Sequence, residues 1–166
     1  MTFLKDLEET KKNLLKKSNV FYIILITFIF IVDRISKNNI IYNFSERSYY
    51  INDFVNLDLI WNIGIGFGIL STNSILFYNL VTFVISLVIL LLMYILISSK
   101  NIDKLIYSVI IGGALGNFYD RLANQAVPDF IDLHYNNFHW FTFNVADIFI
   151  TMGILIFILR GFFIKN

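Results

Sequence analysis

Hydrophobic residues gather into four long runs along the chain, separated by polar segments. The runs occupy approximately residues 19–36, 74–97, 105–120 and 141–163. A helix of about 20 predominantly apolar residues crosses the hydrocarbon core of a bilayer. The run at 74–97 carries no charged residue and is the strongest candidate span. The pattern predicts an all-α membrane protein built as a bundle of four transmembrane helices.

The longer polar segments, 37–73 and 121–140, are predicted to be outer loops. Part of the first shows a period of two instead of a helical period, with apolar residues at alternate positions: Val55, Leu57, Leu59 and Trp61. Such alternation is typical of a half-buried strand. Glycines follow at the same spacing at Gly64, Gly66 and Gly68. We therefore expect a small extracytoplasmic sheet lying on the membrane surface.

Composition supports a single integral membrane domain. Of 166 residues, 57% are hydrophobic and 15% are charged, whereas soluble domains are about 25% charged. The absence of cysteine excludes disulfides, thiolate nucleophiles and cysteine metal sites. No basic block interleaved with aromatic residues indicates a nucleic-acid partner.

Lysine and arginine are distributed unevenly between the two sides of the predicted bundle. Nine lie in the tail before the first run, in the turn after the second and at the C-terminal end, against four on the other side. The positive-inside rule therefore places both termini in the cytoplasm.

We expect segment 1–17 to form a short amphipathic helix, and the run after it to be an uncleaved anchor because no small-residue cleavage site follows.

Asp147 is the only Asp, Glu, Lys or Arg residue between His139 and Arg160, within a predicted span. A charge at mid-membrane costs about 2.5–3.5 kcal/mol on insertion scales. Asp147 must therefore lie near the helix end, have a partner, be protonated or be functional. Asn144 lies three residues earlier and shares its helix face.

The third run carries glycines and polar residues on one stripe, formed by Gly113, Gly116, Asn117 and Asp120. Gly112 and Gly116 have the G-x-x-x-G spacing that permits close helix packing. The stripe is interpreted either as a packing face with a charged end or as a face that brings polar groups into a site.

Asp129 follows the only proline, Pro128, and is flanked by apolar residues. The short connection from Asp129 to Asp147 allows the two carboxyl groups to meet. Two aspartates in one desolvated site retain a proton between them, so that one can activate water while the other donates to a carbonyl oxygen. The alternative is a structural ion pair with Arg121, Arg34 or Lys37, and spacing alone does not decide between the two.

Other chemistries have weaker support. His134 and His139 are five residues apart in a predicted loop, without an H-E-x-x-H motif, so neither a metal site nor a cofactor is expected. Ser36 and Lys37 would diverge by about 100° on a helix and cannot act as a dyad.

Five motifs in chain order together resemble the bacterial lipoprotein signal peptidases, or signal peptidase II. They are Asp33-x-x-x-Lys37, Asn62-x-Gly64-x-x-Phe67-Gly68, Gly112-Gly113-Ala114-x-Gly116-Asn117-x-x-Asp120-Arg121, Val127-x-Asp129-Phe130 and Phe143-Asn144-x-Ala146-Asp147. The chain departs from the family pattern at Arg34, where Gln is frequent, and at Ile65 and Gly66, where alanines are frequent.

The resemblance implies an aspartic endopeptidase of the bacterial inner membrane, with its active site on the outer side. It implies a monomer among membrane lipids that removes the signal peptide from diacylglyceryl-modified prolipoproteins. The implied fold is a four-helix transmembrane bundle with a small extracytoplasmic β-cradle. The implied catalytic pair is Asp129 and Asp147. The implied supporting and substrate-binding residues are Asp33, Lys37, Asn62, Gly113, Asn117, Arg121, Asn144 and Ala146.

Two alternatives belong to other classes of protein. In a proton-coupled small transporter or assembly factor, the aspartates would form a proton relay. That hypothesis expects a charged group in mid-span, whereas the notable aspartates cluster at one face. A structural membrane adaptor would leave the five ordered motifs unexplained.

Overall fold

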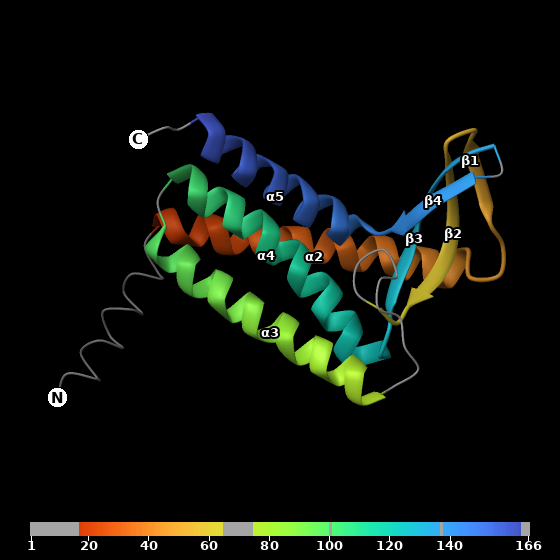
Figure 1. The fold of residues 1–166 in the computed structure, drawn as a ribbon, viewed down its shortest axis with the longest axis horizontal. Coiled ribbons are helices and arrows are strands. Elements are labelled where there is room, and N and C mark those ends of the chain that lie inside the picture. Colours follow the sequence, from red (N-terminus) through yellow and green to blue (C-terminus); the bar gives the residue numbers. More distant parts are fainter. Residues whose placement is uncertain (1–16, 65–74, 100, 137, 164–166) are drawn as a thin grey trace.

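The computed structural model describes residues 17–64, 75–99, 101–136 and 138–163 (Figure 1). The predicted amphipathic helix lies almost entirely outside these residues. The predicted outer glycines Gly66 and Gly68 lie outside them as well.

Four helices form a bundle. They are α2 (Lys17–Asn43), α3 (Ile75–Ser98), α4 (Asn101–Asn124) and α5 (Val145–Phe163). Helix α4 lies centrally and packs against each of the other three (Figure 1). The helices extend beyond several of the apolar runs that predicted them, because polar residues continue α2 and α4 past the ends of those runs.

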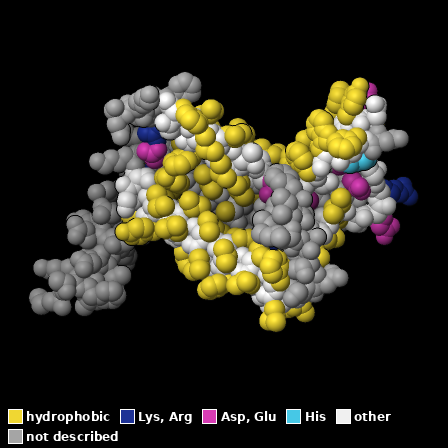
Figure 2. Space-filling view, viewed as in Figure 1, with side chains coloured by type: hydrophobic (Ala, Val, Ile, Leu, Met, Phe, Trp, Pro, Cys, Tyr) yellow, Lys and Arg dark blue, Asp and Glu magenta, His cyan; other side chains and the backbone are white. Residues whose placement is uncertain are grey.

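Three of the described helices are long and apolar enough to cross a membrane: 19–43, 75–98 and 145–162. Hydrophobic side chains cover most of the helical surface on the face shown in Figure 2. Helix α4 is less apolar because it carries Asp103 and Lys104 near its start and Asp120 and Arg121 near its end. The helical membrane fold is thus confirmed, while a fourth transmembrane span remains a prediction.

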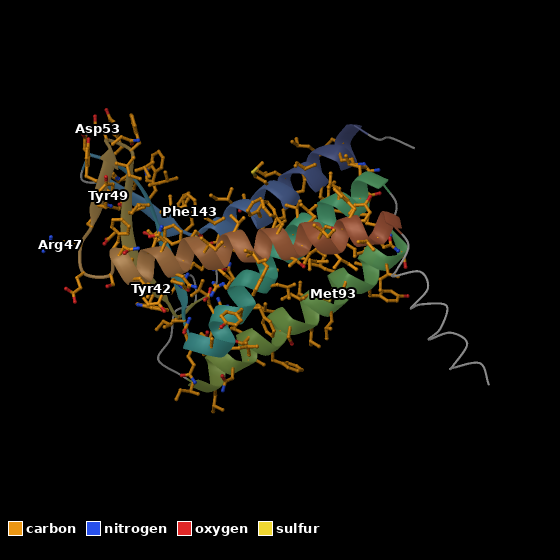
Figure 3. All side chains as sticks on the ribbon, turned by 180° about the vertical axis from the view of Figure 1, so that it is seen from behind. Tyr42, Arg47, Tyr49, Asp53, Met93 and Phe143 are labelled. Atoms are coloured by element: carbon orange, nitrogen blue, oxygen red, sulfur yellow. The ribbon has the colours of Figure 1, made fainter. Side chains whose placement is uncertain are left out.

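The predicted small sheet is present at one end of the bundle. It contains β1 (Tyr49–Asn52), β2 (Val55–Asn62), β3 (Val127–Tyr135) and β4 (Phe138–Phe143), all antiparallel in that order. In Figure 3, Tyr49 and Asp53 lie far out on the sheet, while Phe143 lies where the sheet meets the helices. The segment 121–140 was expected to be a loop, but it contains β3 and part of β4. Residues 141–143, expected in the fourth helix, complete β4.

The β3–β4 hairpin determines how the sheet joins the bundle. Strand β3 begins shortly after α4 ends, and β4 leads through Asn144 directly into α5. Strand β3 also contacts α2 and α4. Consequently Asp129 on β3 and Asp147 on α5 both lie at the junction of sheet and bundle.

Glycines in α4 allow its neighbours to approach closely. A β-carbon on Gly112 would lie 2.8 Å from Cβ of Ile29 in α2, and one on Gly116 would overlap the Asp33 carboxylate. A β-carbon on Gly113 would lie 2.6 Å from the carbonyl oxygen of Ala146 in α5. The glycine-rich segment is therefore a packing face toward two helices at once.

We predict that Gly113→Ala destabilises the protein by about 1–3 kcal/mol, because the backbone at Ala146 must move to admit a methyl group. Gly161→Ala is the matched control, since a β-carbon there meets no atom within 4 Å. Alanine favours helix over glycine by about 1 kcal/mol, so this control should match or exceed the wild type. Apparent melting temperatures in detergent would measure both, and equal values for the two variants would contradict the packing argument.

Candidate active site

The site lies where the sheet meets the bundle, around a pocket of about 320 Å³. Asp129 and Asp147 both line this pocket. Asn62, Asn117 and Arg121 supply further polar groups from β2 and α4. The structure thus brings together two predicted carboxyl groups and three predicted supporting residues.

Asp129 is held by two side-chain amides and is only 3% exposed. Nδ2 of Asn144 donates to Oδ1 at 2.6 Å, and Nδ2 of Asn62 donates to Oδ2 at 2.8 Å. Each carboxylate oxygen therefore has a neutral donor, which fixes the orientation of the carboxyl group without bringing a cation against it.

The pKa of Asp129 is raised to about 6, mainly by burial and in addition by the nearby charge of Asp147. The hydrogen bonds from Asn62 and Asn144 act in the opposite direction, as does the more distant charge of Lys37, but they do not compensate. Asp129 is therefore suited to holding a proton near neutral pH.

Asp147 lies in the first turn of α5 and not in the middle of the span. Asn144 precedes the helix, and its Oδ1 accepts a hydrogen bond from the Asp147 backbone N–H at 3.1 Å. The Asp147 carboxylate accepts in return from the Asn144 backbone N–H at 3.1 Å. This reciprocal pair is a capping box, and the helix N-terminus favours a negative charge there.

Asn144 also connects the two carboxyl groups, since the same side chain that caps α5 donates to Asp129. It is fully buried. A third amide, Asn117 of α4, donates to the other Asp147 oxygen at 2.8 Å. Its own Oδ1 accepts from Nζ of Lys37 at 2.7 Å, so Lys37 acts on Asp147 through Asn117.

Lys37 belongs to a buried cluster of two cations and two carboxylates. Its Nζ lies 2.9 Å from Asp33 and 2.8 Å from Asp120. Arg34 forms a bidentate pair with Asp120, both bonds at 2.6 Å. Asp33 in addition accepts from the backbone N–H of Ala146 at 3.0 Å, which ties α2 to the start of α5.

The partners of the cations in this cluster test the alternative that Asp129 and Asp147 form structural ion pairs. The cations Arg34 and Lys37 pair with Asp33 and Asp120. Within the part of the chain that the structure describes, no salt bridge involves Asp129 or Asp147. The ion-pair interpretation of those two residues was therefore wrong for Arg34 and Lys37.

Arg121 also does not pair with the two pocket aspartates. One terminal nitrogen, Nη2, donates to the Gly64 carbonyl oxygen, and the guanidinium carbon lies 5.6 Å from the centre of the Tyr78 ring. The other, Nη1, is buried and has no hydrogen-bond partner among the described residues. Arg121 therefore offers the pocket an unused donor.

Sequence reasoning did not anticipate the pairing of Arg34 with Asp120. Arg34 was considered as an ion-pair partner for Asp129 or Asp147 and as a departure from the family pattern, but not as the partner of Asp120. The available signal was charge balance, because four charges within apolar helices require mutual pairing when they are buried.

The two histidines lie away from the pocket, on the β3–β4 hairpin. His134 and His139 are register partners on adjacent strands, so the prediction that both lie in a loop was wrong. Together with Asp132 they place three groups that can bind a metal within 4.8 Å of one another. The two pocket aspartates are not part of this group.

The fold and the site define a helical membrane protein with two carboxyl groups, one buried and one half-buried, in one pocket at the end of its bundle. The family model described as Signal peptidase (SPase) II matches residues 25–163. The chain therefore belongs to the signal peptidase II family, which is a family of membrane peptidases. This confirms the resemblance inferred from the five motifs.

Curated relatives agree over most of the chain. The lipoprotein signal peptidase of Pelagibacter ubique (strain HTCC1062) is 45% identical over 151 residues, covering 88% of this chain and 91% of the relative. The lipoprotein signal peptidase of Blochmanniella pennsylvanica (strain BPEN) is 47% identical over 118 residues, covering 68% of this chain and 71% of the relative.

Solved structures share the fold. One, described as a bacterial membrane enzyme, superposes with a TM-score of 0.72 at 29% identity and covers 86% of this chain and 87% of its own. A second with the same description has a TM-score of 0.70 at 28% identity, covering 88% and 94%. The bundle with its small sheet is thus the fold of a bacterial membrane enzyme.

We predict that Lys37→Met destabilises the protein by about 3–5 kcal/mol, because it leaves Asp33 and Asp120 buried with one cation between them. Lys104→Met is the control, since Lys104 donates to Asn19 near the opposite end of the bundle in a partly exposed position. The control should lose no more than about 1 kcal/mol. A similar loss of apparent melting temperature in both variants would contradict the importance of the cluster.

The raised pKa of Asp129 gives a pH dependence of stability. A carboxyl group whose pKa rises from 3.8 to about 6 on folding stabilises the fold fully below about pH 4. This contribution, roughly 3 kcal/mol, is lost as the pH rises through about 6. The Asp129→Asn variant lacks this titrating carboxyl group and therefore lacks its contribution to the pH dependence of stability. Relative to that variant, the wild type should lose apparent melting temperature as the pH rises from 4.5 to 7.5, and a constant difference would refute the assignment.

Proposed function

We propose that this protein is an aspartic endopeptidase that removes signal peptides from diacylglyceryl-modified prolipoproteins. One observation carries the proposal: a buried and a half-buried carboxyl group line one pocket, and their described hydrogen bonds come from neutral amides and backbone N–H groups. This is the arrangement that metal-free aspartic peptidases require. The family and the names of the relatives support the peptidase class and the substrate class.

In the proposed mechanism the two carboxyl groups share one proton. Burial and the charge of Asp147 favour that proton on Asp129. Asp147, as carboxylate, takes a proton from a water molecule, whose oxygen attacks the scissile carbonyl carbon. Asp129 donates its proton to the carbonyl oxygen. When the tetrahedral intermediate collapses, the C–N bond breaks and the amine nitrogen takes up the proton from Asp147. As the carbonyl re-forms, its hydroxyl proton returns to Asp129, which restores the shared proton.

The amides around the pair position these proton transfers. Asn62 and Asn144 hold the Asp129 oxygens, while Asn117 holds one oxygen of Asp147. Each of these amides is held in place by the backbone that carries it or, for Asn117, by its hydrogen bond with Lys37. The carboxyl groups therefore need little reorganisation during the reaction. Asp33 and Ala146 support the same geometry by anchoring the start of α5 to α2.

The pocket suits an apolar peptide segment beside a polar scissile bond. Its remaining lining is predominantly apolar: Ile85, Ala114, Val127, Ile150, Thr151 and Ile154. A signal peptide could contact this surface while the acyl chains of the lipid-modified cysteine remain in the bilayer, which reduces the cost of desolvation. Arg121 lines the same pocket and adds a positive charge beside the peptide segment.

We further propose that all four helices cross the bacterial inner membrane, with both termini cytoplasmic and the pocket on the outer side. The positive-inside distribution of lysine and arginine supports this orientation. The pocket lies at the sheet end of the bundle. Lys104 and Arg160 belong to the opposite ends of α4 and α5 (Figure 1). A monomer surrounded by membrane lipids is the expected state.

The transporter alternative receives less support from the structure. Helix α3 carries no charged residue along its whole length. The carboxyl groups of the pocket and of the buried cluster gather at one end of the bundle and do not form a described path through it. Proton uptake by reconstituted vesicles without proteolysis would favour the transporter.

We predict that Asp129→Asn and Asp147→Asn each abolish cleavage, because loss of the general acid or base costs on the order of 100- to 10,000-fold in rate. The measurement is a gel shift of a diacylglyceryl-modified prolipoprotein incubated with the purified protein in detergent. Asp58→Asn, at an exposed carboxyl group on β2, is the matched control and should retain the wild-type rate.

Three outcomes would count against the proposal. Cleavage that survives in either pocket variant would mean that the catalytic pair is misassigned. No cleavage by folded wild-type protein would remove the peptidase function itself. Equal cleavage of the unmodified prolipoprotein would refute the proposed preference for the lipid-modified substrate.

A further inference from the structure

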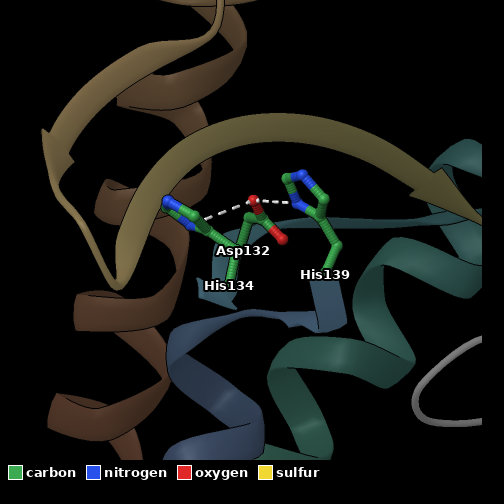
Figure 4. A group of neighbouring side chains, drawn as sticks. All are labelled: Asp132, His134 and His139. Carbon is green, nitrogen blue, oxygen red and sulfur yellow. Dashed lines mark hydrogen bonds and ion pairs between the residues drawn. The ribbon is translucent and has the colours of Figure 1, made fainter. Parts of the chain in front are cut away.

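A second group of chemically active side chains lies on the β3–β4 hairpin, outside the pocket. It consists of Asp132, His134 and His139, with Asp132 lying between the two imidazole rings (Figure 4). Asp132 lies three positions after Asp129 on the same strand, so the two side chains lie on opposite faces of the sheet and about 10 Å apart. The mechanism proposed above uses none of these three residues.

The strand register brings the two histidines to the same place. His134 pairs with His139, although the preceding pairs, such as Leu133 with Phe141, would place Trp140 opposite His134. An irregularity between Leu133 and His134 shifts the register by one residue. Such bulges redirect side chains, and this one stacks the two imidazoles with ring centres 5.3 Å apart.

The spacing of the ligand atoms fits one metal ion. Nδ1 of His139 lies 2.7 Å, and Nδ1 of His134 lies 3.6 Å, from the same oxygen, Oδ2 of Asp132. Ligands bound tetrahedrally to zinc at about 2.0–2.2 Å lie roughly 3.3 Å from one another. The observed separations lie on either side of that value, so small side-chain movements would complete the site.

His134 provides an independent indication of a ligand. Its side chain is 8% exposed, and its Nδ1 is buried without a hydrogen-bond partner among the described residues. An unpaired buried imidazole nitrogen is costly, yet this one faces a carboxylate oxygen from just beyond hydrogen-bond distance. A cation between the two atoms would satisfy both.

We propose that Asp132, His134 and His139 form a binding site for a divalent transition-metal ion of the zinc class. Two imidazole nitrogens and one carboxylate oxygen are ligands that zinc prefers. His139 has a 58% exposed side chain and leaves a route for the ion and for a water molecule as fourth ligand. The ion replaces any proton on Nδ1 of either histidine and joins β4 to β3, the strand that carries Asp129.

The composition of the chain makes this proposal easy to test. The protein has two histidines and no cysteine, so imidazole ligation of a metal can occur only here. Full-length protein with a histidine-free affinity tag would be stripped with chelator and titrated with zinc chloride in detergent by calorimetry. We expect one ion per chain with a dissociation constant on the order of 1 μM or tighter, and a rise of several degrees in apparent melting temperature.

Variants distinguish this site from incidental binding. His139→Asn and Asp132→Asn should weaken zinc binding at least on the order of 100-fold, whereas Asp58→Asn on the same sheet should leave it unchanged. Because His139 is largely exposed, its replacement should preserve the fold, which circular dichroism would verify. Cobalt(II) should give visible absorption bands in the wild type that His139→Asn lacks.

Either of two results would overturn the proposal. One is the absence of saturable one-to-one zinc binding below about 100 μM. The other is equal affinity in the wild type and His139→Asn. Prolipoprotein cleavage is measured separately, so failure of the metal site would leave the peptidase assignment intact.

Discussion

The pairing of Lys37 with Asp33 and Asp120 is the interaction on which the functional end of the bundle depends. A buried ion costs several kcal/mol unless it is paired and fully hydrogen-bonded. Lys37 meets this requirement only when α2 and α4 are in place, because its partners come from both helices. Asp33 then receives the Ala146 N–H, so the start of α5 is held by the same cluster. Glycines at 113 and 116 allow the required close approach.

This cluster also determines the charge state of the pocket. Arg34 and Lys37 are both occupied by Asp33 and Asp120, which leaves amides as the described side-chain donors to Asp129 and Asp147. An amide orients a carboxylate but adds no positive charge, so desolvation continues to raise the pKa of Asp129. A cation in direct contact with the Asp129 carboxylate would have lowered this pKa. The carboxylates paired with cations and the carboxylates of the pocket therefore occupy separate sites because of where the cations lie.

Much of this arrangement was predictable from the sequence. The apolar runs predicted the helices, and alternation at Val55–Trp61 predicted β2. The five motifs contain the two carboxyl groups, the two amides and the arginine of the pocket, although not their contacts, whereas Ile85, Ile150, Thr151 and Ile154 lie outside the motifs. Strand β3 was missed because Val127–Phe130 is buried at every position and lacks alternation. Strand β4 was missed because it is mostly exposed and its last residues continue into the apolar run of α5. The capping role of Asn144 depends on where α5 begins, and the Arg34–Asp120 pair joins residues 86 positions apart. Local sequence patterns therefore predict neither the capping role of Asn144 nor the pairing of Arg34 with Asp120.

The β3–β4 register links the sheet to the pocket. Asp129 lies on β3, while Asp147 follows β4 by only a few residues, so their relative position depends on how the two strands pair. A slip of one residue would turn every β4 side chain to the opposite face and would move Asn144, which contacts both carboxyl groups. Leu133 pairs with Phe141, yet His134 pairs with His139, so the irregularity lies between the pocket and the hairpin tip. An interaction that stabilises the pair of His134 and His139 therefore also stabilises the pairing of β3 with β4. That pairing positions the two carboxyl groups.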